Sequence, residues 1–411
     1  MLIPKPKIYE WSPNLQPLNI SHFTLANSLG LGVSATLEAL KARRSGLLPC
    51  AFEDVDLETY IAKVGMLDSY QVRTDLSAYD CRNNRLAQLC LGQDGFVAAV
   101  DAAKQRYGAA RIGVFMGTST SGILQTELAY RRLDPQTGAL PPDFHYAETQ
   151  NSYSLAGFVT NYLGLGGPSF VVSSACSSSA KVFANAVRLM TAGVCDAAVV
   201  GGVDSLCLST LYGFNSLGLV SHSPCRPYDA ERDGISIGEG AGFVLLERSS
   251  DANRADAIQL LGVGESSDAY HMSTPHPEGL GAKLAMQRAL DSAGLKTDDI
   301  GYINLHGTAT KSNDASEGKA VADIFGTNVP CSSTKGWTGH LLGAAGITEA
   351  IIGVLAVEHG FIPGSVNTRK TDPSIAIDYR IENAAGQVNH VLSNSFGFGG
   401  SNCSLVLGRG K

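Results

Sequence analysis

The sequence predicts an α/β fold built from two similar halves. Apolar segments of strand length alternate with segments of helical periodicity along the chain, which is typical of parallel sheets covered by helices. Residues 112–120 and residues 300–310 both read as a strand that enters a turn of glycine and threonine, and their neighbours follow in the same order. We expect the halves to span residues 1–255 and 256–411, with functional loops at the carboxyl ends of the strands.

The expected strands and helices follow a similar order in both halves. In the first half they are a strand and a helix within 19–46, a helix at 80–103, a strand at 111–116, a polar excursion at 131–151, a helix at 151–164, a strand at 169–172, a helix at 181–192 and a strand at 196–204. In the second half they are a helix at 283–294, strands at 300–305 and 329–333, a helix at 343–359 and a strand at 390–394. Gly46 suits a helix C-terminal cap, and a long polar excursion is usually functional or an interface.

Composition describes a globular chain with a large core. Of 411 residues, 44% are hydrophobic and 17% are charged, and the formal net charge is −7. A negative chain disfavours nucleic acid as a partner and needs a local basic patch to bind anything acidic. The nine cysteines show no paired CxxC spacing, and the start of the chain has no apolar signal segment. We therefore expect free thiols in a reducing cytoplasm, no membrane-spanning run and no metal site.

Cys176 lies at a junction that favours a nucleophile. The β-branched run of residues 169–172 ends just before it, and a helical pattern starts just behind it. A side chain at a sharp strand-to-helix turn is exposed, and the positive end of the helix dipole lowers the pKa of a thiol there. The alternative is a small buried core cysteine, which is the commoner fate of a cysteine in such a run.

Two histidines occupy comparable positions in the second half. His306 follows a buried strand and precedes a Gly-Thr turn, and His340 lies in a glycine-rich segment before the last long helix. Duplicated halves that meet at a pseudo-dyad would bring both histidines to Cys176, although each could instead be a structural imidazole. Glu317 and Lys335 flank the two histidines in the sequence, and either of them could be a surface charge.

These motifs resemble one family, the stand-alone β-ketoacyl-acyl-carrier-protein synthases, which are condensing enzymes of the thiolase superfamily. Cys176 in Ala-Cys-Ser-Ser is similar to the family's acyl-accepting cysteine, and His306 in Asn-Leu-His-Gly-Thr-Ala-Thr and His340 in Lys-Gly-Trp-Thr-Gly-His resemble its two catalytic histidines. Segments 226–241 and 394–402 match as well. The resemblance covers the chain from about residue 19, and Lys311 departs from it because many members have proline there.

The resemblance implies a thiolase-like αβαβα layered fold and an acyltransferase of the EC 2.3.1 class. The implied activity is that of a 3-oxoacyl-[acyl-carrier-protein] synthase, which extends an acyl group on Cys176 by two carbons through decarboxylative condensation with malonyl-acyl carrier protein. The implied partners are an acyl carrier protein and either a second copy of the chain or an inactive ketosynthase-like chain-length factor. No cofactor is implied beyond the phosphopantetheine arm of the carrier protein.

The resemblance also assigns roles to individual residues. The backbone N–H groups of Cys176 and Phe398 would hold tetrahedral oxyanions. His306 and His340 would donate to the malonyl thioester carbonyl, with Lys335 and Glu317 fixing the orientation of the histidines. The substrate-binding residues are expected to be Thr308 and Thr310 on the pantetheine arm, Thr120, Tyr146 and Phe214 in the acyl-pocket wall, Phe398 as its gate, and Phe396. The two threonines could also be simple turn-forming residues.

Two weaker interpretations concern the substrate and the carrier protein. Hydroxyls of Thr120 and Tyr146 suit a saturated chain poorly, because burying an unpaired hydroxyl costs about 1–3 kcal/mol. We therefore expect an unsaturated or aryl-bearing acyl chain, as in polyene biosynthesis, rather than a saturated fatty-acid chain. An acidic carrier protein would need a basic patch, and its candidates, which could equally be solvated helix faces, are Lys41, Arg43, Arg44, Arg82, Arg85, Arg131 and Arg132.

Two rival functions are open to the sequence. A thiolase shares the fold and the nucleophile, but it needs a second cysteine near the C-terminal glycine loop, and here Cys403 lies beyond that loop. A non-catalytic dimer partner that shapes another subunit's pocket, such as a chain-length factor, typically lacks the cysteine, whereas this chain keeps Cys176, His306 and His340 together. A NAD-dependent enzyme is disfavoured, because residues 238–242 lack the GxGxxG spacing.

Overall fold

Two units of five strands share one topology in the part of the chain that the computed structural model describes, residues 15–249 and 257–410. The first unit has the order β6 (Ser169–Val172), β5 (Ile112–Gly117), β7 (Ala197–Asp204), β9 (Gly240–Arg248) and β1 (Leu18–Asn27). The second has the order β12 (Cys331–Ser332), β11 (Tyr302–Asn304), β15 (His390–Gly397), β16 (Ser401–Arg409) and β10 (Ile258–Ser267). The predicted duplication is therefore confirmed, while its boundary near residue 255 lies outside the described residues.

Each unit is a mixed sheet rather than a parallel one. The first three strands of each order are parallel, and the remaining two each pair antiparallel with the strand before them. The prediction of wholly parallel sheets is wrong at these strands. Only the short 3₁₀ turn η6 (Phe398–Gly400) separates β15 from β16, and a parallel return needs a crossover of a dozen residues or more.

The two units join edge to edge through β1 and β10. Backbone pairing of Leu18 with Leu260 and of Asn19 with Gln259 links them. With β2 (Gly30–Leu31) beside β1, the two units form one sheet of 11 strands. The carboxyl ends of the parallel strands of both units open toward the same region, where the candidate residues gather.

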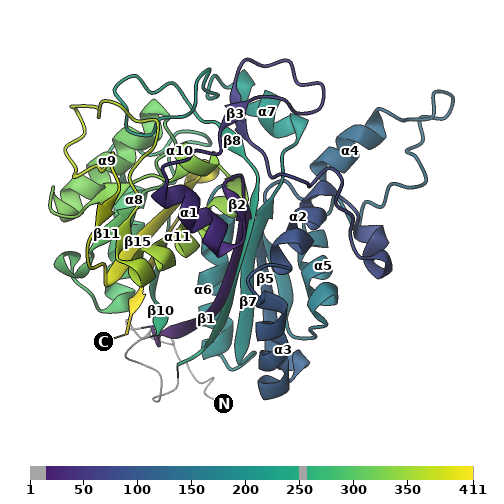
Figure 1. The fold of residues 1–411 in the computed structure, drawn as a ribbon, viewed down its shortest axis with the longest axis horizontal. Coiled ribbons are helices and arrows are strands. Elements are labelled where there is room, and N and C mark those ends of the chain that lie inside the picture. The colour runs from purple at the N-terminus through teal and green to yellow at the C-terminus, as the bar shows by residue number, and fades with distance from the viewer. Residues whose placement is uncertain (1–14, 250–256, 411) are drawn as a thin grey trace, which may run out of the picture.

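Helices form three layers around the two units. α6 (Ser178–Thr191) and α11 (Ala345–His359) pack on each other between the units, which places them in the central layer. The first unit is covered by α2 (Arg82–Leu91), α3 (Phe96–Tyr107) and α5 (Ser154–Leu163), and the second by α8 (Leu280–Ala293) and α9 (Lys311–Phe325) (Figure 1). This is the αβαβα layering that the resemblance implied.

Smaller elements complete the described chain. They are α1 (Val33–Lys41), β3 (Leu48–Pro49), β4 (Tyr60–Ala62), η1 (Thr74–Tyr79), η2 (Ala109–Arg111), α4 (Ile123–Tyr130), α7 (Leu208–Ser216), β8 (Ile237–Gly238), η4 (Thr297–Asp299), α10 (Lys335–Thr338), η5 (Leu342–Ala344), β13 (Phe361–Ile362) and β14 (Ala384–Ala385). Three of them, β3, β4 and β8, form a separate small sheet.

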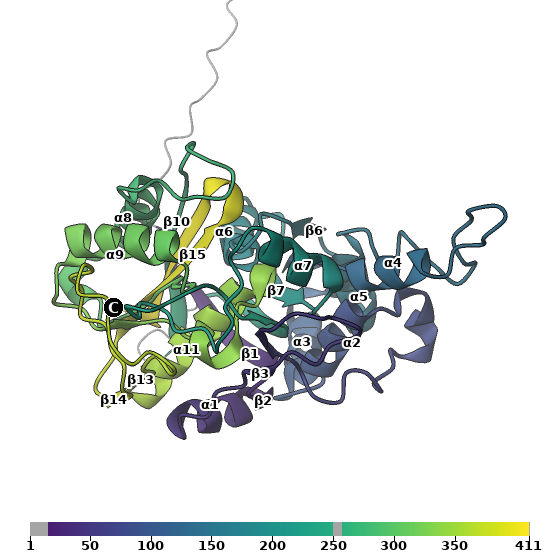
Figure 2. The ribbon, with the colours of Figure 1, turned by 90° about the horizontal axis from the view of Figure 1, so that it is seen from above.

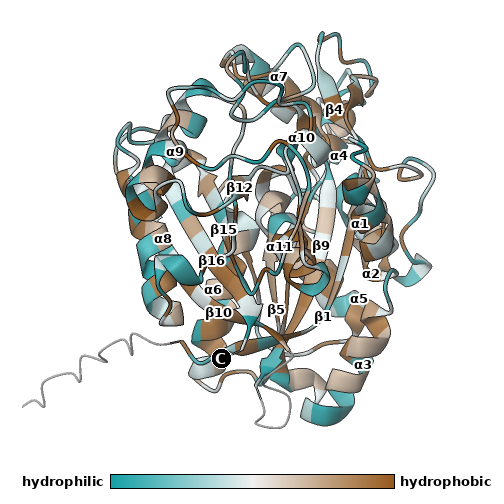
Figure 3. Ribbon diagram, turned by 60° about the vertical axis from the view of Figure 1, so that its left-hand side comes forward, coloured by the Kyte–Doolittle hydropathy of each residue, from teal (hydrophilic) through white to brown (hydrophobic). Residues whose placement is uncertain are grey.

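Apolar residues concentrate on the central strands and on α11, while the outer helices α3 and α8 carry hydrophilic faces (Figure 3). Residues 342–359, which include α11, are apolar enough to pass the length and hydropathy test for a membrane span. The sequence prediction of no such run therefore needs correction. Of this stretch, however, 89% is buried inside the fold, as expected for the central helix of a layered protein.

Three local expectations differ from the structure. The helix predicted at 80–103 is two helices, α2 and α3, because Asp94 and Gly95 adopt left-handed backbone angles between them. Gly46 does not cap α1, which ends at Lys41 with Arg43 in the left-handed region. The excursion that follows α4 contains no helix or strand within residues 131–153, and it projects from the body of the molecule (Figure 2).

Candidate active site

A strained turn places Cys176 at the start of α6. β6 ends at Val172 and α6 begins at Ser178, and Ala175 between them has a φ of 51°, a value that non-glycine residues adopt infrequently. The Ser178 hydroxyl accepts a hydrogen bond from the backbone N–H of Ser174 (2.9 Å) and donates one to the carbonyl of Ala175 (2.6 Å). The short serine side chains around Cys176 therefore stabilise the turn that the strand-to-helix pattern predicted.

Cys176, His306 and His340 converge from separate parts of the chain. His306 follows β11, and His340 follows α10. Nε2 of His340 lies 3.1 Å from Sγ of Cys176, and the two imidazole rings are 5.3 Å apart between centroids and inclined at 79°. All three side chains are buried, and a nitrogen or sulfur atom from each lies within 4.8 Å of the others. The structure therefore brings together the three residues that the sequence singled out.

Hydrogen bonds to Nδ1 set the tautomer of both histidines. The backbone N–H of Leu342 donates to Nδ1 of His340 (3.2 Å), and the ammonium group of Lys335 lies 3.3 Å from Nδ1 of His306. Because Nδ1 accepts in each ring, the proton of each neutral imidazole resides on Nε2. A protonated Nε2 is a hydrogen-bond donor rather than a metal ligand, so this tautomer suits anion stabilisation better than metal binding.

Both imidazoles are held neutral. Burial lowers the pKa of His306 well below 6.5, and the positive charge of Lys335 and the neighbouring His340 act in the same direction. Burial likewise lowers the pKa of His340 well below 6.5, again with help from Lys335. A neutral N–H donor keeps its function across the physiological pH range, since it has no proton to lose or gain there.

Lys335 links His306 to a residue that sequence reasoning missed. Its ammonium group also bonds the backbone carbonyl of His306 and lies 2.5 Å from Oε1 of Glu349. Both charged side chains are buried, and burial raises the pKa of Glu349 to about 7 against the opposing effect of Lys335. Glu349 is the one acidic residue within residues 342–357 of an otherwise apolar stretch, and that isolated charge was the available signal.

Glu317 acts on the backbone of the His306 turn rather than on its ring. Its carboxylate accepts the backbone N–H groups of His306 and Gly307 (both 2.8 Å), the side-chain amide of Asn394 (3.1 Å) and the hydroxyl of Tyr228 (3.1 Å). The expectation that Glu317 orients the histidine therefore needs restating: it fixes the turn that carries the ring, and Lys335 contacts the ring itself.

The thiol of Cys176 is less acidic than the helix position suggested. Burial raises its pKa to about 11, although Lys335 and the backbone N–H of Phe398 act in the opposite direction. The sequence-based expectation of a lowered pKa is wrong, because it counted the helix terminus and not the burial of the sulfur. The thiol is protonated at neutral pH.

The backbone of the C-terminal glycine loop lies against the Cys176 turn. The N–H of Phe398 hydrogen-bonds the sulfur, and a Cβ on Gly397 would come within 3.3 Å of the Cys176 nitrogen and 2.9 Å of the Ser174 carbonyl oxygen. Glycine at position 397 allows this close approach. The N–H groups predicted to form an oxyanion hole thus belong to two backbone segments in contact.

A small apolar cavity of about 50 Å³ adjoins the three residues. Of the predicted substrate-binding residues, it is lined by Thr308, Thr310, Phe214, Phe396 and Phe398. The rings of Phe214 and Phe398 lie 5.5 Å apart, and the Phe396 ring lies 6.0 Å from His306. The hydroxyls of Thr308 and Thr310 lie 2.9 Å apart, and they also accept the backbone N–H groups of Thr310 (3.3 Å) and Asn313 (3.3 Å), respectively, which is the pattern of turn-forming residues.

Thr120 and Tyr146 are not part of this cavity. The Thr120 hydroxyl is buried but bonds Asp204 (2.9 Å), and Tyr146 is 60% exposed. Neither residue is an unpaired hydroxyl in the cavity wall, so the physical ground for expecting an unsaturated acyl chain is removed at both positions.

Asp204 is a second residue that sequence reasoning missed. At the end of β7, its buried carboxylate accepts hydrogen bonds from the backbone N–H and hydroxyl groups of Ser119 and Thr120, from the Thr118 hydroxyl and from the backbone N–H of Gly343. It thereby ties the glycine turn after β5 to the segment that follows His340. Asp204 could have been found in the sequence as the one acidic residue at the end of an apolar strand.

Most of the predicted docking cations are already paired. Arg82 is buried and bonds Glu239 (2.7 and 2.6 Å) and Asp68, so its predicted exposed position is wrong. The ion pairs of the others are Arg43 with Glu382, Arg85 with Asp80, Arg131 with Asp54 and Arg132 with Asp143. Of these candidates, Lys41 and Arg44 are exposed and make no ion pair within the described residues.

Two segments of the chain match one known family. Residues 90–252 match the beta-ketoacyl synthase N-terminal domain, and residues 258–369 match the beta-ketoacyl synthase C-terminal domain. The chain is 31% identical over 410 residues to 3-oxoacyl-[acyl-carrier-protein] synthase 2 of Vibrio cholerae, covering 94% of this chain and 97% of that protein. It is 32% identical over 376 residues to the Staphylococcus aureus protein of the same name, covering 86% and 91%.

Solved structures are similar over nearly the whole chain. The ketosynthase ApeO in complex with its chain length factor ApeC from Xenorhabdus doucetiae superposes with a TM-score of 0.87 and 38% identity, covering 96% of this chain and 98% of that one. The ishigamide ketosynthase/chain length factor superposes with a TM-score of 0.84 and 28% identity, covering 97% and 100%. A beta-ketoacyl synthase from Burkholderia phymatum superposes with a TM-score of 0.85 and 28% identity, covering 97% of this chain and 100% of that one.

Proposed function

Because the chain belongs to the β-ketoacyl synthase family, we propose that it is a 3-oxoacyl-[acyl-carrier-protein] synthase that condenses an acyl group on Cys176 with malonyl-acyl carrier protein. The observation that carries the proposal is the 3.1 Å contact between Sγ of Cys176 and Nε2 of His340, with the His306 ring beside it. A nucleophile facing two neutral N–H donors suits acyl transfer followed by enolate chemistry.

The first step is thioester exchange. Sγ of Cys176 attacks the carbonyl carbon of an acyl group on the carrier's pantetheine sulfur, and the tetrahedral oxyanion accepts the N–H groups of Cys176 and Phe398. The intermediate expels the pantetheine sulfur, which leaves with the proton of the Cys176 thiol. One thioester replaces another, so the step is neutral overall. The positive charge of Lys335 favours the transient thiolate.

The second step forms the carbon–carbon bond. Malonyl thioester loses carbon dioxide, and the electron pair of the broken bond passes to an enolate whose oxygen accepts the Nε2–H groups of His306 and His340. The enolate carbon attacks the acyl carbonyl on Cys176, and the thiolate of Cys176 departs and takes up one proton from water. The product is a 3-oxoacyl thioester longer by two carbons.

The cavity implies that the acyl chain enters by displacing a side chain. Its volume of about 50 Å³ is far below the 300–1,000 Å³ of ordinary ligand pockets. Phe398 borders it and begins η6, in which Gly399 and Gly400 have φ of 80° and 71°. Rotation of the Phe398 side chain about this glycine turn would open the space, in keeping with a gate. Thr308 and Thr310 then face the pantetheine arm.

The substrate class remains a separate proposal. A polyene chain is one hypothesis, and a saturated fatty-acid or polyketide chain is the other. Since Thr120 and Tyr146 no longer favour the first, competition between hexanoyl and polyenoyl carrier thioesters for Cys176 must decide. Preference for the hexanoyl thioester would reject the polyene hypothesis.

We further propose that the partners are an acyl carrier protein and a second ketosynthase-like subunit, either another copy or a chain-length factor. The end of α4 and the projecting segment that follows it leave Tyr130, Tyr146 and Tyr153 exposed, and aromatic residues are enriched at protein–protein interfaces. The nine cysteines are all described and all free, which supports a reducing cytoplasm. The carrier protein brings the phosphopantetheine.

The rival functions are less well supported. A thiolase needs a second cysteine at the reacting centre, but Cys403 lies buried in β16 and does not line the cavity. A chain-length factor typically lacks the cysteine, whereas Cys176 is assembled here with both histidines. The experiment is a condensation assay in which mass spectrometry follows 3-oxoacyl-carrier protein after mixing the chain with acyl- and malonyl-carrier protein. Wild type and the control Cys207→Ala should form product, and Cys176→Ala should not. Equal product from Cys176→Ala would reject the proposal.

A further inference from the structure

Leu342 adopts a strained backbone conformation directly beside His340. Its φ is 51°, a value that is uncommon for a bulky side chain. In this conformation its backbone N–H donates to Nδ1 of His340 (3.2 Å). That bond leaves the proton of the neutral ring on Nε2, which faces Sγ of Cys176 at 3.1 Å. Backbone strain at a functional site persists only where the surrounding structure holds it, so something must hold Leu342.

Asp204 holds the peptide that follows Leu342. Oδ2 of its carboxylate accepts the backbone N–H of Gly343 at 2.5 Å. A Cβ on Gly343 would lie 2.8 Å from the same oxygen, so glycine permits this close approach. Asp204 ends β7 of the first unit, whereas Gly343 lies in η5, between His340 and α11. The bond therefore ties the segment after His340 to a strand end in the other half of the chain.

The carboxylate of Asp204 is itself held by the turn that follows β5. It accepts the Thr118 hydroxyl (2.7 Å) and the backbone N–H groups of Ser119 (2.8 Å) and Thr120 (2.9 Å). The Ser119 hydroxyl donates to Asp204 (2.5 Å) and accepts the N–H of Gly343 (3.3 Å). Asp204 is fully buried and forms no ion pair within residues 15–249 and 257–410. Hydrogen bonds rather than a cation therefore offset the desolvation of its charge.

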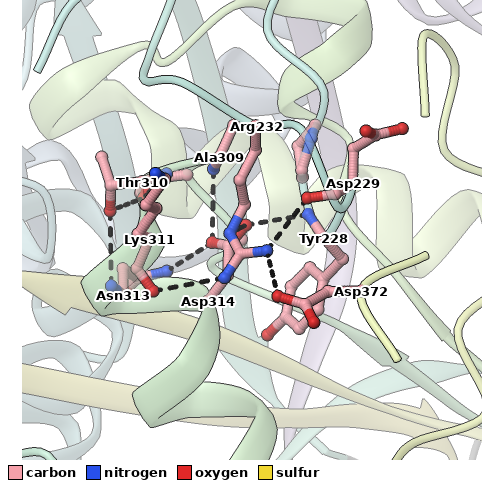
Figure 4. Close-up of polar contacts among 12 residues, drawn as sticks. Tyr228, Asp229, Arg232, Ala309, Thr310, Lys311, Asn313, Asp314 and Asp372 are labelled. Carbon is pink, nitrogen blue, oxygen red and sulfur yellow. Dashed lines mark hydrogen bonds and ion pairs between the residues drawn. The ribbon is translucent and has the colours of Figure 1, made fainter. Parts of the chain in front are cut away.

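The second unit contains a comparable arrangement, which Figure 4 shows. The buried carboxylate of Asp314 accepts the backbone N–H groups of Tyr228 (2.8 Å) and Ala309 (3.2 Å). These two residues have φ of 59° and 68°, so one carboxylate holds two strained residues. Asp314 differs from Asp204 in having a cation beside it, since Nε of Arg232 lies 3.5 Å away. The molecule thus uses buried carboxylates to hold left-handed backbone at two places around the site.

We propose that Asp204 is a positioning residue for His340: by fixing the peptide after Leu342, it keeps the Leu342 N–H on Nδ1 and the proton of the ring on Nε2. The inference rests on the proposed function, in which Nε2 of His340 donates a hydrogen bond to the enolate oxygen. Asp204 does not line the cavity, so it acts through the imidazole rather than on the substrate. Its loss should therefore slow decarboxylation more than acylation of Cys176.

Three variants of similar shape test this role through the rates of malonyl-carrier protein decarboxylation and of Cys176 acylation. Asp204→Asn places an amide among the N–H donors and should slow decarboxylation by about tenfold or more, while acylation falls by less than about threefold. Ser119→Ala and Thr118→Val each remove one hydroxyl donor to the same carboxylate, but only the Ser119 hydroxyl also contacts Gly343. Ser119→Ala should slow decarboxylation by about threefold or more, and Thr118→Val should match wild type.

The tautomer of His340 is a readout that a merely structural role would not move. NMR spectra of protein carrying isotopically labelled histidine report the protonation of each ring nitrogen, and His340→Gln assigns the signals. Wild type and Thr118→Val should show the proton of His340 on Nε2 alone. Asp204→Asn should show a mixture of the two tautomers, because the Leu342 N–H is no longer held on Nδ1.

Two results would overturn the positioning role: equal decarboxylation rates in Ser119→Ala and Thr118→Val, or an unchanged His340 tautomer in folded Asp204→Asn. The comparison of the serine and threonine variants decides the question even where Asp204→Asn does not fold. Failure of wild type to decarboxylate malonyl-carrier protein would instead count against the proposed function, and the NMR comparison would still decide whether Asp204 sets the tautomer.

Discussion

Nζ of Lys335 lies 2.5 Å from Oε1 of Glu349, and both side chains are almost completely buried. The same ammonium group lies 3.3 Å from Nδ1 of His306. A buried charge pair is costly to form, and here it places a fixed positive charge beside two imidazoles that burial has already made weakly basic. The pair therefore fixes Nδ1 of His306 as a hydrogen-bond acceptor, and its positive member helps to keep both rings neutral.

The first prediction concerns this pair. Glu349→Gln should slow decarboxylation of malonyl-carrier protein by about tenfold or more, the scale expected when a group that orients an active-site imidazole is lost. Acylation of Cys176 should be affected less, because Glu349 does not contact the sulfur. Release of labelled carbon dioxide measures decarboxylation, and the intact mass of the protein measures acylation of Cys176. Glu358→Gln, an exposed glutamate on the same helix, is the control, and an equal loss in both variants would contradict the assignment.

The second prediction is that neither histidine titrates between pH 6 and pH 8. The pKa values of His306 and His340 lie well below 6.5 because of burial and Lys335, so both rings are neutral over this range. Burial raises the pKa of Glu349 to about 7, so protonation of Glu349 should slow decarboxylation by wild type as the pH falls through 7. In Glu349→Gln, which has no group to titrate at that position, the rate of carbon dioxide release at saturating malonyl-carrier protein should be nearly equal at pH 6 and pH 8. A fall in the rate of this variant centred near pH 6.5 would show that an imidazole of ordinary basicity is required.

The third prediction concerns the thiol. Because burial raises the pKa of Cys176 to about 11, its thiolate fraction should increase about tenfold per pH unit between pH 7 and pH 9. Alkylation of Cys176 by iodoacetamide, followed by peptide mass spectrometry, should rise in parallel. Lys335→Met should slow alkylation further, since the positive charge of Lys335 lowers the pKa. An alkylation rate that does not change between pH 7 and pH 9 would mean that Cys176 is already a thiolate at pH 7, which would contradict the raised pKa.

The fourth prediction separates structural from docking arginines. Arg82→Met leaves the buried carboxylate of Glu239 without its partner and should lower the free energy of unfolding by about 3–5 kcal/mol. Arg132→Met breaks an ion pair between two exposed side chains and should cost about 0–1 kcal/mol. Denaturant titration measures both. Equal and small losses of the free energy of unfolding in the two variants would contradict the buried network around Arg82. Folded Arg82→Met should also bind carrier protein as tightly as wild type.

The sequence predicted the parts of the fold that depend on local pattern. The paired segments ending at residues 117 and 305 revealed the duplication, because apolar strands followed by glycine turns are visible in the chain itself. Strands β9 and β16 were not among the predicted elements, and the expected parallel arrangement is wrong there, since strand direction depends on how the connections close in space. Cys176, His306 and His340 were nominated because each follows a strand or precedes a long helix at a glycine-rich turn.

The sequence did not predict quantities that depend on burial and pairing. Cys176 has a raised pKa because neighbours distant in sequence exclude water from it, and no local pattern reports that. Arg82 looks like a surface arginine on a helix, but Glu239, 157 residues away, draws it into the core. Glu349 and Asp204 were visible as single acids in apolar surroundings, but their partners, Lys335 and the turn at residues 118–120, could only be identified in the folded chain.

The measurement that tests the central claim most directly is the intact mass of the chain after mixing with acyl-carrier protein alone. We predict a single acyl adduct on wild type that maps to Cys176, no adduct on Cys176→Ala, and an adduct that persists in His306→Ala/His340→Ala when malonyl-carrier protein is added. Removing both N–H donors should slow condensation by about 100-fold or more without removing the nucleophile. An adduct on another cysteine, or prompt loss of the adduct to malonyl-carrier protein in the double variant, would contradict the division of labour proposed for this site.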